Sequence, residues 1–194
     1  MITVREMYRR AICGPFNKGG PVSDYNITEY DDAVWVTFDG TAFPEGITKW
    51  YDMLTNLDCR PIKYYNMGWF ANGFFQAMRN NYLVVPGNGK PVIYSGFSHG
   101  GAIADLYAQM NPGDTAITFG APRTRWGIKT RTKKNITHYA IRNDPVVRLA
   151  PAWLGFYHPG KTIWLDRVDA PMIDKDLSKC SHMQYGKVLE RMGI

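Results

Sequence analysis

The stretch Pro91–Met110, PVIYSGFSHGGAIADLYAQM, contains a strand pattern, a glycine-flanked serine and a helical pattern, in that order. The β-branched and aromatic run Val92–Tyr94 predicts a buried strand, and apolar residues at helical spacing across Ala102–Tyr107 predict a helix. Between them lies a G-x-S-x-G match centred on Ser98. Glycines two residues either side of a serine let neighbouring backbone pass close to a sharp strand-to-helix turn. The stretch therefore predicts a nucleophile elbow that presents Ser98 at the carboxyl edge of a sheet; a glycine-rich turn with an incidental serine is the alternative.

Strand and helix patterns alternate along the rest of the chain. We expect strands at Ala33–Phe38, around Tyr64 and Tyr65, and at Thr115–Phe119, Thr137–Ile141 and Thr162–Leu165, the last as an edge strand. We expect helices around Val4–Ile12 and over Ile47–Leu57, Ala71–Tyr82 and Ser181–Arg191. This alternation predicts an α/β fold with a mixed, mostly parallel central sheet, helices on both faces, and one compact domain over residues 1–194.

The composition is that of a globular protein, with 45% hydrophobic and 21% charged residues. The three cysteines lack metal-ligand spacing, so we expect reduced thiols. No apolar run has the length of a signal-peptide core or of a membrane-spanning helix. These features predict a cytoplasmic protein without a transmembrane segment, although lysis or a non-standard export route would also release such a chain.

A net charge of +6 favours anionic surfaces as partners. The segment Arg123–Lys134 concentrates basic side chains with no acid among them: Arg123, Arg125, Lys129, Arg131, Lys133 and Lys134. A solvated loop is the favoured interpretation, and contact with an anionic lipid surface is the alternative. We do not expect a nucleic-acid partner, because no recognised nucleic-acid-binding signature accompanies the segment.

A serine nucleophile requires a base to take its proton and a carboxylate to orient that base. In sheets of the predicted kind these groups follow the order serine, acid, histidine. Asp144 is the best acid, because it follows the strand Thr137–Ile141 and precedes Pro145 on a loop aimed at the same sheet edge as Ser98. A plain turn aspartate is the alternative there. Asp105 lies within the helix after Ser98, where a solvated or capping role is expected.

The chain has four histidines, which narrows the choice of base. His99 adjoins Ser98, and its backbone N–H is a better oxyanion-hole donor than its ring is a base. His138 lies within a predicted strand and before Asp144. His158 and His182 both remain open on these grounds.

Four segments together carry a resemblance: VTFDGT (Val36–Thr41), GFSHGGAIA (Gly96–Ala104), TFGAPR (Thr118–Arg123) and NDPVVRLAP (Asn143–Pro151). In this order and spacing the chain resembles the class 3, or fungal-type, lipases of the α/β-hydrolase fold, over roughly Ala33 to Tyr185. The resemblance implies that Ser98 is the nucleophile and Asp144 the triad acid. It also implies that His182 is the base, because Ser181–Tyr185 resembles the family's catalytic histidine segment, whereas Tyr157–Gly160 resembles one whose histidine is not catalytic.

The resemblance further implies that Thr41 belongs to the oxyanion hole. The family's lid corresponds here to Ile47–Leu57, with Trp50, Met53 and Leu54 as lipid-facing residues; a core-packed helix is an equally good interpretation of that pattern. Asp39 departs from the family, which commonly has arginine at this place, and the chain is shorter than typical members.

These observations predict a serine carboxylester hydrolase that cleaves lipid esters through an acyl-enzyme intermediate and requires no metal or organic cofactor. An acyltransferase with the same triad is one alternative. An inactive hydrolase scaffold that binds anionic membrane or nucleic acid is another.

Overall fold

The computed structural model describes residues 3–16, 23–40, 58–81, 83, 85–86, 89–128, 132–172 and 179–194. The expected helix at Ile47–Leu57, and with it Trp50, Met53 and Leu54, lies outside these residues. Thr41 also lies outside them.

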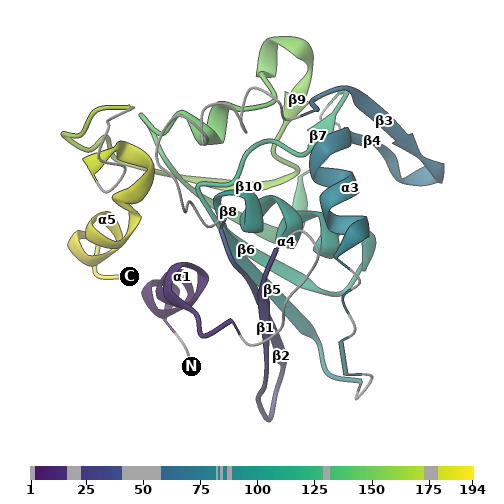
Figure 1. Cartoon of the computed structure of the whole chain (residues 1–194), viewed down its shortest axis with the longest axis horizontal. Coiled ribbons are helices and arrows are strands. Elements are labelled where there is room, and N and C mark those ends of the chain that lie inside the picture. Colours follow the sequence, from purple (N-terminus) through teal and green to yellow (C-terminus); the bar gives the residue numbers. More distant parts are fainter. Residues whose placement is uncertain are drawn as a thin grey trace.

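A six-stranded sheet forms the centre of the molecule (Figure 1). Its order is β1 (Tyr25–Glu29), β2 (Val34–Phe38), β5 (Val92–Phe97), β6 (Thr115–Phe119), β8 (Lys133–Ile141) and β10 (Gly160–Leu165). β1 pairs with β2 in antiparallel fashion, and all the other neighbours are parallel. The mixed, mostly parallel sheet confirms the predicted fold class, and β10 is the edge strand that was expected.

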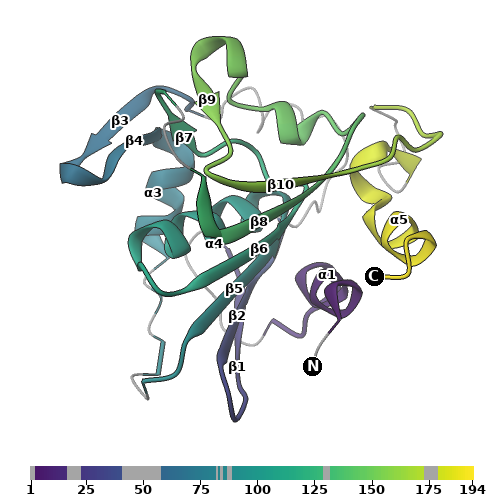
Figure 2. The ribbon, with the colours of Figure 1, turned by 180° about the vertical axis from the view of Figure 1, so that it is seen from behind.

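Helices cover both faces of this sheet. Helices α1 (Val4–Cys13) and α5 (Tyr185–Arg191) lie together on one side, and α3 (Asn72–Asn80) lies on the other, as the opposed views in Figures 1 and 2 show. The alternation of side chains along β2 produces these two layers. Val34 and Val36 pack in one buried cluster with α3 and α4 (Ser98–Met110), whereas Trp35 packs in a second cluster with α1 and α5.

A second, smaller sheet was not predicted. It has the order β3 (Pro61–Tyr64), β4 (Gly68–Ala71), β7 (Arg125–Trp126) and β9 (Phe156–Tyr157), and all its neighbours are antiparallel. Phe70 and Phe156 anchor this sheet in the buried cluster that contains α3 and α4. The strands are too short for a period-2 pattern to stand out in the sequence, and β7 and β9 pair only with distant segments.

Several element bounds differ from the predictions for physical reasons. β8 begins at Lys133 and β7 occupies Arg125–Trp126, so Arg123–Lys134 is not simply a solvated loop. The strand expected near Tyr64 ends there, since Tyr65 has a φ of 40° and starts a 3-10 turn. The closing helix divides into the 3-10 turn η5 (Ser181–Met183) and α5, because side chains of that turn bond to the loop after β8.

No helix among the described residues is long and apolar enough to cross a membrane.

Candidate active site

Ser98 stands at the junction of β5 and α4, as the elbow pattern predicts. Its φ is 53°, in the left-handed region that non-glycine residues rarely adopt, and its side chain is buried. Such strain persists only where the surroundings enforce it. A Cβ at Gly96 would collide with the backbone of Gly100, and a Cβ at Gly100 would collide with the backbone carbonyl of Asp39. The flanking glycines therefore permit the close backbone approach that the turn requires.

Asp144 lies in the loop after β8, wholly buried, and three donors surround its carboxylate. The Val146 N–H donates to Oδ1 at 2.8 Å. Oδ2 lies 2.8 Å from His182 Nδ1 and accepts a bond from the Tyr185 hydroxyl at 2.8 Å. These bonds satisfy the oxygen atoms of a carboxylate that is buried away from water. The arrangement fixes the orientation of both Asp144 and the His182 ring.

Tyr185 is a positioning residue that the sequence did not assign. Its hydroxyl accepts the Ile141 N–H at 2.9 Å while donating to Asp144. Burial, followed by the nearby Asp144 charge, raises the pKa of Tyr185 well above its ordinary value, so the phenol stays protonated as a donor. A tyrosine three residues after His182 was the available signal.

The His182 ring lies against the elbow. It stacks on Phe97, the residue before Ser98, with ring centroids 4.5 Å apart and planes 24° from parallel. Gly120, with a φ of 59° after β6, closes over the same ring: a Cβ there would lie 2.9 Å from His182 Cε1 and 3.1 Å from Asp144 Oδ2. Three loops after β5, β6 and β8 thus meet η5 at the carboxyl edge of the sheet.

His158 occupies a different environment from His182. Its Nε2 lies 3.3 Å from the Val147 carbonyl, and its ring centroid lies 4.7 Å from that of His138. His138 Nδ1 in turn lies 2.7 Å from the Thr118 hydroxyl. The structure therefore pairs His182, the base that the family resemblance implies, with Asp144, and places the His158 ring against the Val147 carbonyl instead.

The His99 side chain lies near α3, where its ring centroid is 6.0 Å from that of Phe74. Burial lowers the pKa of His99 to about 4, so the ring is neutral at physiological pH. Its backbone belongs to the first turn of α4, whose N-terminal end carries a partial positive charge. This environment suits the backbone-donor role that the sequence predicts.

Asp39 follows β2 and precedes Gly40 beside the elbow. Burial, and then the neighbouring Asp24, raise the pKa of Asp39 to about 6, against a smaller lowering by the Gly40 N–H. The backbone N–H of Asp39 donates to the Asp24 carbonyl at 2.9 Å. A carboxyl whose pKa is raised to about 6 therefore stands where the lipases that the sequence resembles commonly have arginine.

The expectation that Asp105 is solvated or caps a helix is wrong. Its side chain is wholly buried between α4 and the small sheet, where it accepts a short hydrogen bond from the Thr124 hydroxyl. Oδ1 has no hydrogen-bond partner among the described residues. Burial raises the pKa of Asp105 to about 7, and the smaller opposing effects of Thr124, Gln109 and Arg125 do not cancel it.

The cysteines and the acidic and histidine side chains show no sign of a disulfide or metal centre among the described residues. All three cysteines are free thiols. Over the described part of the chain, no three His, Cys, Asp or Glu side chains gather in a group that could hold a metal ion.

Comparison with known proteins finds this fold among solved structures. A scan against family models and a search of curated proteins each found no match. Among solved structures, the Rhizomucor miehei lipase propeptide complex is 18% identical with a TM-score of 0.55, covering 84% of this chain and 61% of that chain. The lipase from Rhizopus microsporus var. chinensis is 19% identical with a TM-score of 0.58, covering 84% and 66%. Lip2 lipase from Yarrowia lipolytica is 15% identical with a TM-score of 0.55, covering 86% and 73%.

These similarities define the class of fold. The chain has an α/β-hydrolase-like fold whose structural neighbours are fungal lipases, the group that its sequence motifs resemble. It spans less than two thirds of the length of the Rhizomucor miehei protein, at 61%. At these identities the likeness establishes the fold alone.

Proposed function

We propose that this protein is a serine carboxylester hydrolase that acts on lipid esters through Ser98, Asp144 and His182. The observation that carries the proposal is the hydrogen bond of 2.8 Å between His182 Nδ1 and Asp144 Oδ2, made by a ring that stacks beside the strained serine turn. A carboxylate on Nδ1 directs the other ring nitrogen, Nε2, to act as the base.

In the proposed first step, His182 Nε2 takes the hydroxyl proton as Ser98 Oγ attacks the ester carbonyl carbon. The carbonyl π electrons move onto oxygen, and the resulting tetrahedral oxyanion collapses when the C–O bond to the alcohol breaks. The imidazolium returns its proton to the departing alkoxide. Water then attacks the acyl-serine by the same route and releases a carboxylic acid, and Asp144 stabilises the imidazolium in both halves.

The proposed oxyanion hole uses the backbone N–H groups of His99 and Thr41, with the Thr41 hydroxyl as a further donor. The partial positive charge at the start of α4 supports the His99 position. One missing oxyanion donor typically costs about 10²- to 10³-fold in kcat.

The proposed substrates are carboxylic esters of lipids, and the proposed setting is peripheral contact with an anionic lipid surface. The net charge of +6 and the apolar walls around the base, including Phe97, support this choice.

A fluorophosphonate probe and p-nitrophenyl ester turnover test the nucleophile. We expect the probe to label Ser98, and Ser98→Ala to lower turnover by about 10⁴-fold or more. Unlabelled Ser98 in the folded protein, or unchanged turnover in Ser98→Ala, would overturn the proposal. Product analysis with added alcohols separates a hydrolase from an acyltransferase: dominant transfer to the alcohol rather than to water would replace the hydrolase assignment.

A pair of histidine variants tests the base. We expect His182→Ala to abolish turnover, whereas His158→Ala retains most of it, because only the His182 ring bonds to Asp144 among the described contacts. His158 is a matched control, since both rings are buried. The reverse pattern would show that the base has been misassigned.

A further inference from the structure

Large apolar side chains project into solvent at one end of the small sheet. We call this group the apolar tip, which consists of the exposed side chains of Trp69 (40% exposed), Ile128 (86%), Trp153 (83%) and Leu154 (46%) around the half-buried Trp126. Soluble proteins rarely expose several such side chains together unless they mark an interaction site.

The strand register brings these residues together from three distant segments. Trp69 in β4 pairs with Trp126 in β7, and Trp126 pairs in turn with Phe156 in β9. The Trp69 and Trp126 rings lie 5.6 Å apart. Trp126 Nε1 donates to the Leu154 carbonyl at 2.8 Å, and the Gly127 N–H donates to the Gly155 carbonyl at 3.0 Å. Ile128 follows Gly127 directly, so it emerges beside the turn that contains Trp153 and Leu154.

The sheet that carries the tip is held firmly on the protein. The Arg125 guanidinium lies 4.5 Å above the Phe70 ring and donates to Gln109 of α4 at 3.2 Å. Phe70 and Phe156 are buried in the main core. A rigid base lets the exposed side chains enter a partner surface without a further ordering cost.

The charge around the tip is positive. No Asp or Glu occurs in residues 59–104, 115–143 or 145–165, the ranges that contain the four strands of the small sheet, and Asp58, just before the first range, is paired with Arg60 at 2.8 Å. Lys63 is exposed and pairs directly with Trp69 across β3 and β4. Arg123 donates to the carbonyls of Arg148 and Ala150, which places two more cations at the turn that leads to Trp153.

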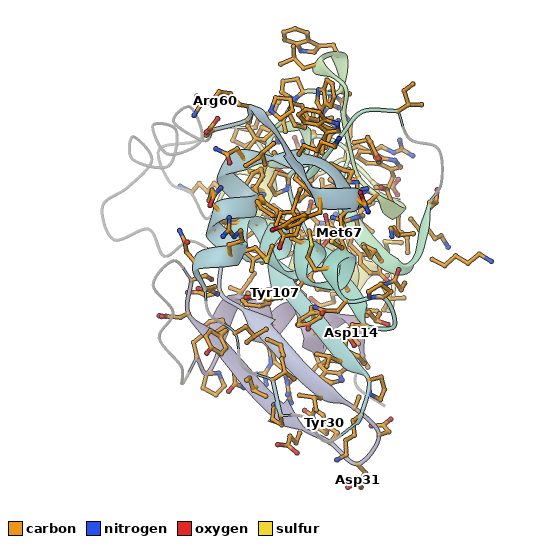
Figure 3. The ribbon with its side chains drawn as sticks, turned by 90° about the vertical axis from the view of Figure 1, so that its right-hand side faces the viewer. Tyr30, Asp31, Arg60, Met67, Tyr107 and Asp114 are labelled. Atoms are coloured by element: carbon orange, nitrogen blue, oxygen red, sulfur yellow. The ribbon has the colours of Figure 1, made fainter. Side chains whose placement is uncertain are left out.

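Acidic side chains lie at the other end of the molecule. Asp31 and Asp32 are exposed at the β1–β2 turn. Figure 3 shows Tyr30 and Asp31 at the opposite end of the molecule from Arg60, which directly precedes the first strand of the small sheet. The acidic β1–β2 turn therefore lies away from Arg60 and the start of the small sheet.

We propose that the apolar tip, with Lys63, Arg123 and Arg148 beside it, is a docking surface for the headgroup and upper acyl region of an anionic phospholipid bilayer. Trp side chains favour the membrane–water interface, and cations near the surface are drawn to anionic headgroups. The aliphatic Ile128 and Leu154 argue for lipid over nucleic acid, because they gain by leaving water and cannot stack on bases as aromatic rings do. This inference rests on the lipid contact of the proposed function and gives that contact a place on the molecule; docking itself requires no ester hydrolysis.

Vesicle co-sedimentation tests this surface, with Ser98→Ala as the parent protein so that lipid is not consumed. We expect the parent to sediment with phosphatidylcholine vesicles that contain phosphatidylserine, and more weakly with pure phosphatidylcholine or at high salt. Adding Ile128→Ala and Trp153→Ala should lower the partition coefficient by at least about tenfold, since two large apolar side chains leave the interface. Lys63→Glu should lower binding several-fold and reduce its salt dependence.

Trp164→Ala is the matched control, because Trp164 is a 42% exposed tryptophan on β10 of the main sheet. We expect it to partition as the parent does. Equal partitioning of the parent and the Ile128/Trp153 variant would overturn the proposal, as would capture of the parent by single-stranded RNA but not by vesicles. Turnover of water-soluble p-nitrophenyl acetate by the Ser98 protein, with and without the tip substitutions, reports separately on the catalytic proposal. Vesicle binding without turnover would leave the docking surface standing and remove the esterase.

Discussion

Asp144 and Asp105 are two buried aspartates whose side chains have different surroundings in this fold. Both side chains are wholly buried. The Asp144 carboxylate receives bonds from a backbone N–H, a phenol and an imidazole at the sheet edge. Asp105, within α4, receives a bond from Thr124, and its Oδ1 has no hydrogen-bond partner in the described residues. Burial alone therefore does not mark a catalytic acid; the surrounding donors do.

Substitution of the two carboxylates should separate them most sharply. We expect Asp144→Asn to lower kcat/KM by about 10³- to 10⁴-fold, because the amide cannot hold the His182 tautomer or stabilise its cation. Asp105→Asn should keep kcat/KM within about threefold of the parent, since the hydrogen bond that Asp105 accepts comes from Thr124 and not from a residue of the proposed triad. Ester turnover measures both, and similar losses in the two variants would remove the distinction.

Gly120→Ala should disturb the Asp144 site without changing any of its polar groups. The new Cβ would lie 2.9 Å from His182 Cε1, so we expect the ring to shift and kcat to fall by about 10²-fold. Gly113→Ala is the control: Gly113 has a φ of 120° with open space around its Cβ position. Its substitution strains the backbone but should leave kcat unchanged, so equal losses would point to general destabilisation.

Tyr185→Phe removes one of the donors that distinguish Asp144 from Asp105. We expect kcat to fall about three- to tenfold, and the free energy of unfolding to fall by about 1–2 kcal/mol because the Ile141 N–H loses its acceptor. Tyr94→Phe serves for comparison. The Tyr94 hydroxyl donates a hydrogen bond of 3.2 Å to Asp114, which is not part of the proposed site. A positioning role predicts that only Tyr185→Phe changes kcat and the pH–rate profile.

We expect Asp105 to change how the free energy of unfolding depends on pH, and to have little effect on activity. Its pKa in the folded protein, about 7, is raised above the ordinary value of 3.8, so the folded state holds a proton that the unfolded state releases between these values. Across this window the contribution of Asp105 to the free energy of unfolding should fall as pH rises, by roughly 2–4 kcal/mol, and then level off above pH 7. Denaturant melts of Asp105→Asn should lack this component. A parallel pH dependence in parent and variant would show that Asp105 titrates normally.

The sequence predicted the parts of the molecule that depend on local patterns. The β-branched and aromatic run of β2 and the helical spacing in α1 and α4 follow from short-range geometry, so these elements lie close to their predicted bounds. The elbow at Ser98 was also predictable from the sequence, because a Cβ atom at either flanking glycine would collide with nearby backbone atoms. Asp144 was singled out because it follows a strand.

The tertiary structure decided which of these residues meet. Without the family resemblance, the sequence left His158 and His182 both open as the base; the resemblance of Ser181–Tyr185 favoured His182. The bond between His182 and Asp144 joins positions 38 residues apart, so its geometry is a property of the tertiary structure. The small sheet and the apolar tip likewise join β4, β7 and β9, whose short strands become stable only when they pair. The burial of Asp105 follows from that sheet packing over α4. Local propensity therefore determines where strands, helices and turns form, whereas long-range packing determines the environment, and so the chemistry, of each side chain.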